Sequence, residues 1–183
     1  MQMTPWHGDL LFSASDGAHG REPWISDGTA GGTLMLRDFS VGPRSSNPLG
    51  FSGGTTRAVF LGGSRHTLRR TDGTSEGTRF LTSSDGRRVP VANDPKRVVG
   101  VGFLFAASSA LDGELWVTKG WRAGTRRVKD INPGAAGSYP ADFIDLTPGD
   151  ALFHASDGVH GDELWITDGT ATGTKLVRDI NPA

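Results

Sequence analysis

Apolar and polar residues alternate along short runs of this chain, and turn-forming residues separate the runs. In the run 163–167, Glu-Leu-Trp-Ile-Thr, alternation places Glu163 and Trp165 on one face of a strand and Leu164 on the other. An Asp-Gly pair follows at 168–169, and such a pair between two runs is a strong hairpin signal. The pattern predicts antiparallel β-strands, and because no segment has an extended helical period, almost no helix is expected.

The same pattern recurs four times at a nearly fixed spacing. The apolar pairs end at Phe12, Phe60, Phe105 and Phe153, which are 48, 45 and 48 residues apart. Threonines at the ends of the turns, Thr33, Thr78, Thr125 and Thr174, keep a similar spacing of 45, 47 and 49. A repeat of this length fits four short strands, the size of a propeller blade. We therefore expect four units, at about 1–47, 48–95, 96–140 and 141–183.

The expected fold is all-β: a β-propeller of four four-stranded antiparallel blades. The sequence is compatible with two ways of closing the ring. The chain can form a four-bladed ring, or it can form half of an eight-bladed ring that a second chain completes. A half-ring exposes two apolar blade faces, and a homodimer through those faces would cover them. The residues expected between the blades are Leu11, Phe12, Trp24, Phe60, Leu104, Phe105, Trp116, Leu152, Phe153, Leu164 and Trp165.

Composition narrows the class of protein. The chain has 183 residues, with 27 Gly, 10 Pro and 36% hydrophobic residues, which suits a turn-rich β protein. Twenty acidic and nineteen basic side chains leave no bulk field for nucleic-acid binding. The absence of cysteine excludes disulfides and thiolate metal sites. The segment 1–11 resembles neither a signal peptide nor a membrane span, so no membrane insertion is expected.

Charge is unevenly distributed along the repeats. Residues 1–57 and 141–183 together hold 6 basic and 13 acidic residues, a net charge of −7, whereas 58–140 hold 13 basic and 7 acidic residues, a net charge of +6. This distribution has two interpretations: variation among solvated surface residues, or a dipolar particle that binds itself or a charged polymer through its basic half.

A known family shares the motif of the fourth unit. Glu-Leu-Trp-Ile-Thr-Asp-Gly-Thr at 163–170, Gly-Thr at 173–174 and Val-Arg-Asp-Ile-Asn-Pro at 177–182 resemble the bacterial ELWxxDGT repeat family. The first unit follows the motif well, the third in part and the second weakly. The resemblance implies propeller-like repeat proteins that are often exported or surface-associated, so an extracytoplasmic or cell-surface location is expected. It brings no shared catalytic residues.

The Asp-Gly turns have a structural and a functional interpretation. The carboxylates of Asp27, Asp72 and Asp168 can bind nearby backbone N–H groups and hold the turn. They are also suitable calcium ligands, although none of the turns has the dense acidic pattern of a known calcium loop, and Lys119 replaces the aspartate in the third unit. No cofactor is predicted, and calcium remains the alternative.

Two loops, in the first and fourth units, contain histidine after Asp-Gly: His19 and His160. They are expected on the same rim as the connections between blades, where propellers commonly bind ligands. Histidine there can be an ordinary loop residue or a ligand-binding group.

The expected function is a non-enzymatic binding or assembly module that recognises a glycan or a protein surface through the irregular loops of that rim. The candidate residues are His19, Arg44, Asn47, Arg87, Arg88, Asn93, Asp94, Tyr139 and His160. One alternative is a glycoside-active enzyme, since such chemistry needs only two rim carboxylates. The other is a purely structural spacer.

Overall fold

The structure, a computed structural model, describes residues 3–134, 136–180 and 182. Over these residues it is all-β, as the sequence predicts: sixteen strands form four four-stranded antiparallel sheets, each with its strands in chain order. In the described residues, helix is limited to the 3-10 turn η1 (Arg122–Gly124).

Each sheet lies within one repeat of the sequence. Sheet 1 contains β1 (Met3–Trp6), β2 (Asp9–Ala14), β3 (Glu22–Ser26) and β4 (Leu34–Met35). Sheet 2 contains β5 (Leu49–Gly53), β6 (Ala58–Gly62), β7 (Thr67–Thr71) and β8 (Arg79–Phe80). Sheet 3 contains β9 (Lys96–Val98), β10 (Gly102–Ala106), β11 (Leu115–Thr118) and β12 (Arg126–Lys129). Sheet 4 contains β13 (Ala141–Thr147), β14 (Asp150–Ser156), β15 (Asp162–Thr167) and β16 (Lys175–Arg178).

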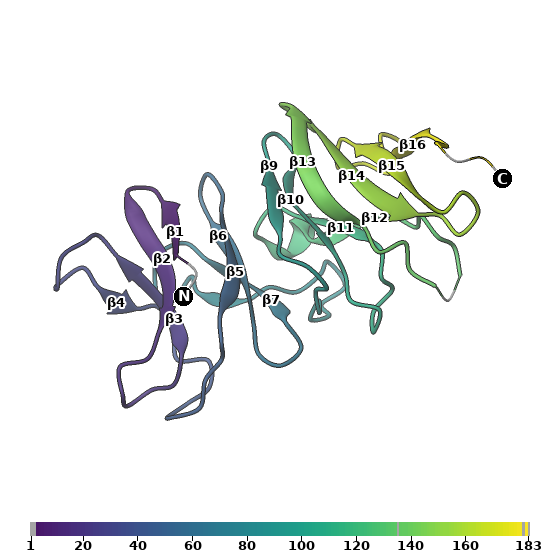
Figure 1. Ribbon diagram of the computed structural model, residues 1–183. Coiled ribbons are helices and arrows are strands. Elements are labelled where there is room, and N and C mark those ends of the chain that lie inside the picture. Colours follow the sequence, from purple (N-terminus) through teal and green to yellow (C-terminus); the bar gives the residue numbers. More distant parts are fainter. Residues whose placement is uncertain (1–2, 135, 181, 183) are drawn as a thin grey trace.

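The sheets pack in chain order, mainly through the first strand of each. Strand β5 contacts β1, β2 and β9, while β13 contacts β9 and β10. Figure 1 shows the result: sheet 1, in purple, and sheet 4, in green and yellow, lie at opposite ends of the molecule, with sheets 2 and 3 between them. The arrangement is an open series of blade-like sheets.

Three apolar clusters fill the spaces between neighbouring sheets, and all follow one rule. One sheet contributes mainly aliphatic side chains, joined by Trp6 in the case of sheet 1, and the next contributes the face that carries its central phenylalanine. Leu11 of sheet 1 packs with Phe60 of sheet 2. Val59 of sheet 2 packs with Phe105 of sheet 3, and Leu104 of sheet 3 with Phe153 of sheet 4.

The cross-strand register explains this rule. Phe105 is paired with Trp116 and Phe153 with Trp165, so each phenylalanine and its tryptophan lie side by side on one face. Both tryptophans are buried, which confirms their predicted role as wedges between sheets. Replacing such a buried tryptophan by alanine typically costs about 3–5 kcal/mol.

The prediction that Phe12, Trp24, Leu152 and Leu164 lie between sheets is wrong. Phe12 and Trp24 are half-buried on the face of sheet 1 that points away from sheet 2. Leu152 is half-buried and Leu164 is exposed on the outer face of sheet 4. Their strand positions match those of core residues, but no described sheet covers these two end faces.

Buried glutamates fasten the connections between sheets. Glu22 accepts hydrogen bonds from the backbone N–H groups of Phe39 and Ser46 and from the Ser46 hydroxyl, at 3.1, 2.9 and 2.6 Å. Glu114 binds the connection after sheet 3 in the same way. The glutamate of the repeated Glu-Leu-Trp pattern is therefore a structural residue, since it ties its own sheet to the start of the next.

Sheet 2 departs from the repeat at two positions. Thr67 replaces the glutamate, and it forms a β-bridge with Pro90 of the longer connection, so that backbone pairing holds this connection. Arg69 replaces the tryptophan and is buried, with its guanidinium 4.1 Å from the ring centre of Phe39 and 5.0 Å from that of Phe80. Burial lowers the pKa of Arg69 to about 10. Cation-π stacking here takes the place of the buried indole.

Candidate binding site

The loops gather on two opposite rims of the sheets. The rim formed by the first and third turns of each unit is called the turn rim, and it contains residues 7–8, 27–33, 54–57, 72–78, 99–101, 119–125, 148–149 and 168–174. The other is called the connector rim, and it contains the second loops of the units and the connections between sheets. On the connector rim, Gly20 donates to Gly42 and Ser156 to Ser138, so these loops and connections lie side by side as expected.

Three of the four turns after the third strand are built by the Asp-Gly-Thr sequence. In the fourth unit, Asp168 Oδ1 accepts hydrogen bonds from the backbone N–H and the hydroxyl of Thr170, at 2.7 and 2.6 Å. The Thr170 hydroxyl oxygen then accepts the N–H of Gly173 at 3.0 Å. A Cβ atom at Gly173 would overlap the Asp168 carboxylate, which explains the glycine of the motif.

The turns of Asp27 and Asp72 repeat this geometry. Hydrogen bonds from the following threonine lower the pKa of all three aspartates. These carboxylates therefore have a structural role in the turns. The described residues contain no group of three or more His, Asp or Glu side chains arranged to hold a metal ion.

The third turn keeps the backbone geometry with different side chains. The hydroxyls of Thr118 and Thr125 lie 2.6 Å apart, and the equivalent hydroxyl pairs of the other three turns lie 2.7 Å apart. Lys119 stands where the others have aspartate, and Trp121 stands where they have threonine. Neither side chain can make the aspartate-threonine hydrogen bonds, and both are exposed, with 42% of Trp121 accessible. The turn is therefore held without them.

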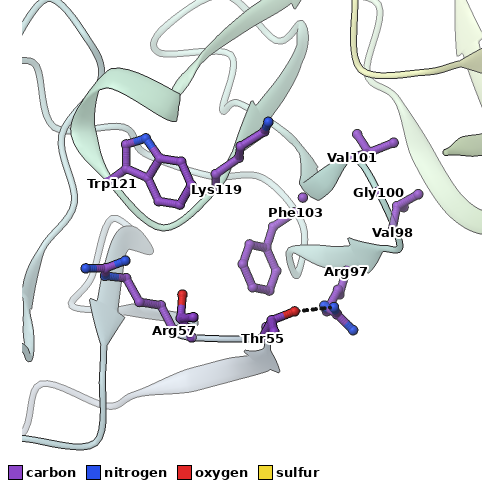
Figure 2. A pocket seen from close by; sticks show the side chains of 12 residues that line it. Thr55, Arg57, Arg97, Val98, Gly100, Val101, Phe103, Lys119 and Trp121 are labelled. Atoms are coloured by element: carbon purple, nitrogen blue, oxygen red, sulfur yellow. Dashed lines mark hydrogen bonds between the residues drawn. The ribbon is translucent and has the colours of Figure 1, made fainter. Parts of the chain in front are cut away.

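These two side chains border a pocket of about 260 Å³ between sheets 2 and 3. The pocket is lined by Gly54, Thr55, Thr56, Arg57, Arg97, Val98, Gly100, Val101, Gly102, Phe103, Lys119 and Trp121. Figure 2 shows the Phe103 ring in the middle, with Lys119 and Trp121 on one side and Thr55 and Arg97 on the other. The walls come from the β5–β6 turn, the β9–β10 turn and the third Asp-Gly-Thr-like turn.

The charged side chains that line the pocket are all cationic. The Arg57 guanidinium lies 5.9 Å from the centre of the Trp121 ring, and Arg97 donates a hydrogen bond to the Thr55 hydroxyl at 3.0 Å. Lys119 adds a third positive charge, and none of the lining residues is a carboxylate. Cations that line one pocket together with an exposed indole form a surface suited to an anionic ligand with an apolar face.

A second pocket of about 330 Å³ continues the site toward sheet 4. It shares Lys119 and Trp121 with the first, so the tryptophan stands between the two. Its far wall includes Arg126, which donates a hydrogen bond to the carbonyl of Gly169 at 2.9 Å. The two pockets together extend along the turn rim over sheets 2, 3 and 4, which suits an extended ligand.

The residues predicted from the sequence lie on the connector rim, away from this pocket. His19 Nδ1 is 2.8 Å from Asp16, and His160 Nδ1 is 2.6 Å from Asp157, so each histidine is paired within its own loop. These pairings raise the pKa of both histidines. The pKa of Asp16 is lowered to about 2, first by the hydrogen bond from the backbone N–H of His19 and then by the pairing with its imidazole. For Asp157, burial opposes the shift, but hydrogen bonds from His160 and Val159 outweigh it and lower its pKa to about 2.

The arginine and acidic candidates are dispersed along the connections. Arg44 is exposed in the first connection. Arg87 is 3.2 Å from Asp85, and the Arg88 guanidinium stacks 3.8 Å from the ring centre of Phe80. The side chain of Asp94 is exposed and lies beside Gly50.

The remaining candidates, Asn93, Asn47 and Tyr139, help to fix the backbone conformation of the connections between sheets. Asn93 donates to the carbonyl of Pro140 and accepts the N–H of Ala106, both at 2.8 Å, so its amide is used structurally. Asn47 and Tyr139 occupy equivalent positions and have positive φ angles of 45° and 49°. Tyr139 is also exposed, and its ring lies near Gly113. None of these connector-rim candidates lines either of the two turn-rim pockets.

Sequence reasoning missed Arg57, Arg97, Lys119 and Trp121. A signal was present for two of them, because Lys119 and Trp121 interrupt a motif whose other copies are intact. From the sequence alone, the replacement indicates a degenerate copy of the repeat. The structure shows that the turn is preserved. Arg57 and Arg97 have no repeat signature, and they line the same pocket as Trp121 only through the packing of sheets 2 and 3.

No protein-family model, curated protein or solved structure matches this chain. The resemblance to the ELWxxDGT repeat family and the location it implies therefore stay predictions. Among the described residues, no helix has the length and apolar character needed to cross a membrane.

Proposed function

We propose that this chain is a non-enzymatic binding module, built as blades of an ELWxxDGT-type β-propeller, and that it binds an acidic glycan on its turn rim. Four sheets of one design, packed through their first strands, support the propeller part of the proposal. The family resemblance supports an exported or cell-surface setting.

The observation that carries the binding proposal is the exchange of Asp-Gly-Thr for Lys119-Gly-Trp121 at a turn that keeps its shape. After this exchange, the side chains of residues 119 and 121 do not hold the turn. They lie instead at the border of the pocket, whose charged side chains are cationic. An accessible tryptophan in a pocket that also contains three cations favours a ligand-binding role.

The chemistry of the pocket favours a uronate-type sugar. The indole face offers an apolar platform for the C–H face of a sugar ring, while Arg57, Arg97 and Lys119 can bind its carboxylate. A polymer of such sugars would extend from this pocket into the neighbouring one, which shares Trp121. A protein ligand with an acidic, aromatic-binding surface is the competing partner.

The enzyme alternative has less support. Glycoside hydrolysis uses two carboxyl groups, one of which must donate a proton. The pocket between sheets 1 and 2 contains Asp9 and Asp72. The Thr74 hydroxyl and N–H hold the Asp72 carboxylate and lower its pKa, which disfavours it as a proton donor.

The test measures binding of polygalacturonate by calorimetry. The informative variant is the double exchange Lys119→Asp with Trp121→Thr, because it restores the motif of the other three turns and keeps Gly124 in its required place. Loss of a central aromatic contact typically costs about 2 kcal/mol, so affinity should fall roughly 30-fold or more. Binding should also weaken with added salt, since the cations are solvent-accessible.

The matched control is the double variant Arg87→Ala with Arg88→Ala on the connector rim. The proposal expects this control to bind as the unmodified chain does. If the control loses binding and the turn variant keeps it, the connector rim is the binding surface and the turn-rim assignment is wrong. Binding of fully methyl-esterified polymer with equal affinity would contradict the role of the cations.

A further inference from the structure

The two end faces of the molecule are the two halves of the interface that already recurs three times inside the chain. Each internal interface joins the aliphatic face of one sheet to the phenylalanine face of the next. Sheet 1 uses its aliphatic face, with Leu11 and Ile25, against sheet 2. Its phenylalanine face is left open at one end of the molecule, and the aliphatic face of sheet 4 is left open at the other (Figure 1).

The open face of sheet 1 has the register of a buried one. Phe12 is paired with Trp24, and Trp24 with Met35. In sheet 4, Phe153 is paired with Trp165, and Trp165 with Leu176, and this row is packed against sheet 3. Met3, next to Phe12, is 58% exposed, so the row on sheet 1 is an apolar surface of the kind that the chain elsewhere buries.

The open face of sheet 4 is the complementary one. Ile144, Leu152 and Ile166 are cross-strand neighbours on this face, as Leu104 and Val117 are on the covered face of sheet 3. Ile144 is 63% exposed. The face therefore presents an aliphatic row where the repeating design expects a phenylalanine face to dock.

We propose that a second copy of this chain covers both faces, head to tail, so that sheet 1 of each copy packs on sheet 4 of the other. Continuity with the three internal interfaces identifies the occupant, since the chain itself carries both matching halves. A two-fold axis makes the two contacts at once and closes the assembly. Propeller rings typically have about four to eight blades, and two copies supply eight sheets, the one multiple of four above a single copy in that range.

This inference goes beyond glycan binding and does not depend on it, because the Trp121 pocket lies between sheets 2 and 3. An assembly of two copies would carry two such pockets on one ring. The two proposals can therefore fail separately.

The first test is the mass of the chain in solution by light scattering. The expected value is twice the 19.3 kDa mass of one chain. Ile144→Glu on sheet 4 and Met3→Glu on sheet 1 should each give a single-chain mass, whereas Val41→Glu, at an 85% exposed position on the connector rim, should keep the dimer. A single-chain mass for the unmodified protein, or a mass that grows beyond two chains, overturns the proposal.

The second test asks which faces meet. The chain has no cysteine, so single cysteine variants can be joined specifically by a short bis-maleimide reagent. A mixture of Met3→Cys and Ile144→Cys chains should give a covalent dimer, and neither variant alone should do so. A third sample is the chain that carries both Met3→Cys and Ile144→Cys. A cross-link between these two cysteines within one chain would establish a four-sheet ring. It would overturn the proposal of a second copy, whatever the outcome for polygalacturonate binding.

Discussion

The carboxylate of Glu114 accepts two hydrogen bonds from Ser138, one from the backbone N–H at 2.9 Å and one from the hydroxyl at 2.7 Å. Glu22 and Ser46 have the same relationship at the same separation of 24 residues. Because both partners are buried, each pair fixes where the chain leaves one sheet and enters the next. The repeat is therefore held together by a polar clamp as well as by its apolar faces.

Replacing Glu114 by Gln tests this clamp. The amide presents an NH2 group to donors at Ile131 and Ser138, so at least one buried N–H or hydroxyl loses its acceptor. We expect a loss of about 3 kcal/mol in the free energy of unfolding, the upper range for a buried unsatisfied group. Denaturant unfolding measures it.

The exposed Glu76 supplies the control for the clamp. Glu76→Gln should change the unfolding free energy by less than about 0.5 kcal/mol, as is usual for surface substitutions. Equal stability of the Glu114 and Glu76 variants would show that the clamp contributes little.

The glycine of the Asp-Gly-Thr turns gives a second prediction. Gly173→Ala places a methyl group on the Asp168 carboxylate and should destabilise the fold by about 1–3 kcal/mol, as overpacking does. In an Asp168→Ala background the same change should cost much less, because the overlapping atoms are gone. Gly31→Ala, at an open position of the first turn, is the neutral control. Unfolding measurements of this double-mutant cycle should show coupling, and simple additivity would contradict the explanation.

The histidine loops give a prediction for pH. The side-chain hydrogen bond with Asp16 raises the pKa of His19, so Asp16→Asn should return it toward 6.5. His160, whose partner Asp157 is unchanged, is the internal reference. NMR titration of the imidazole protons measures both. If His19 titrates identically in the variant, the pairing with Asp16 does not set its pKa.

The same pKa shifts define the pH range over which this loop stabilises the fold. The raised pKa of His19 stabilises the folded state fully below about 6.5, and this contribution is lost as pH rises through the folded value. The lowered pKa of Asp16 contributes above about 3.8 and is lost as pH falls toward 2. The Asp16–His19 pair therefore stabilises the loop most between about pH 3.8 and about pH 6.5.

Local patterns predicted most of the fold, because strand alternation and turn chemistry act over a few residues. The faces of Trp116 and Trp165 follow from alternation alone, and the role of Asp168 follows from its position before glycine. The position of Phe12 on an uncovered face could not be predicted in this way, since its local sequence is that of a core residue. Whether one sheet packs against another depends on how all four sheets are arranged in space.

The candidate site was less predictable for a related physical reason. Arg57 and Trp121 come from different sheets, and their proximity depends on how sheets 2 and 3 pack. Arg69 shows the same limit, because an arginine at a tryptophan position predicts exposure until Phe39 and Phe80 are seen to enclose it. The pairing of His19 with Asp16, three residues before it, is local and lies in the loop that the sequence singled out.

The indole N–H signals of the five tryptophans allow the most direct test of the binding proposal. Trp6, Trp24, Trp116 and Trp165 donate their Nε1–H groups to acceptors within the protein. Trp121 borders both turn-rim pockets.

The measurement is a titration with galacturonate oligomers followed by NMR of these five signals. The account predicts a saturable shift of the Trp121 signal, with smaller changes at the other four, and loss of the shift at high salt. Saturating oligomer that leaves the Trp121 signal in place would contradict it.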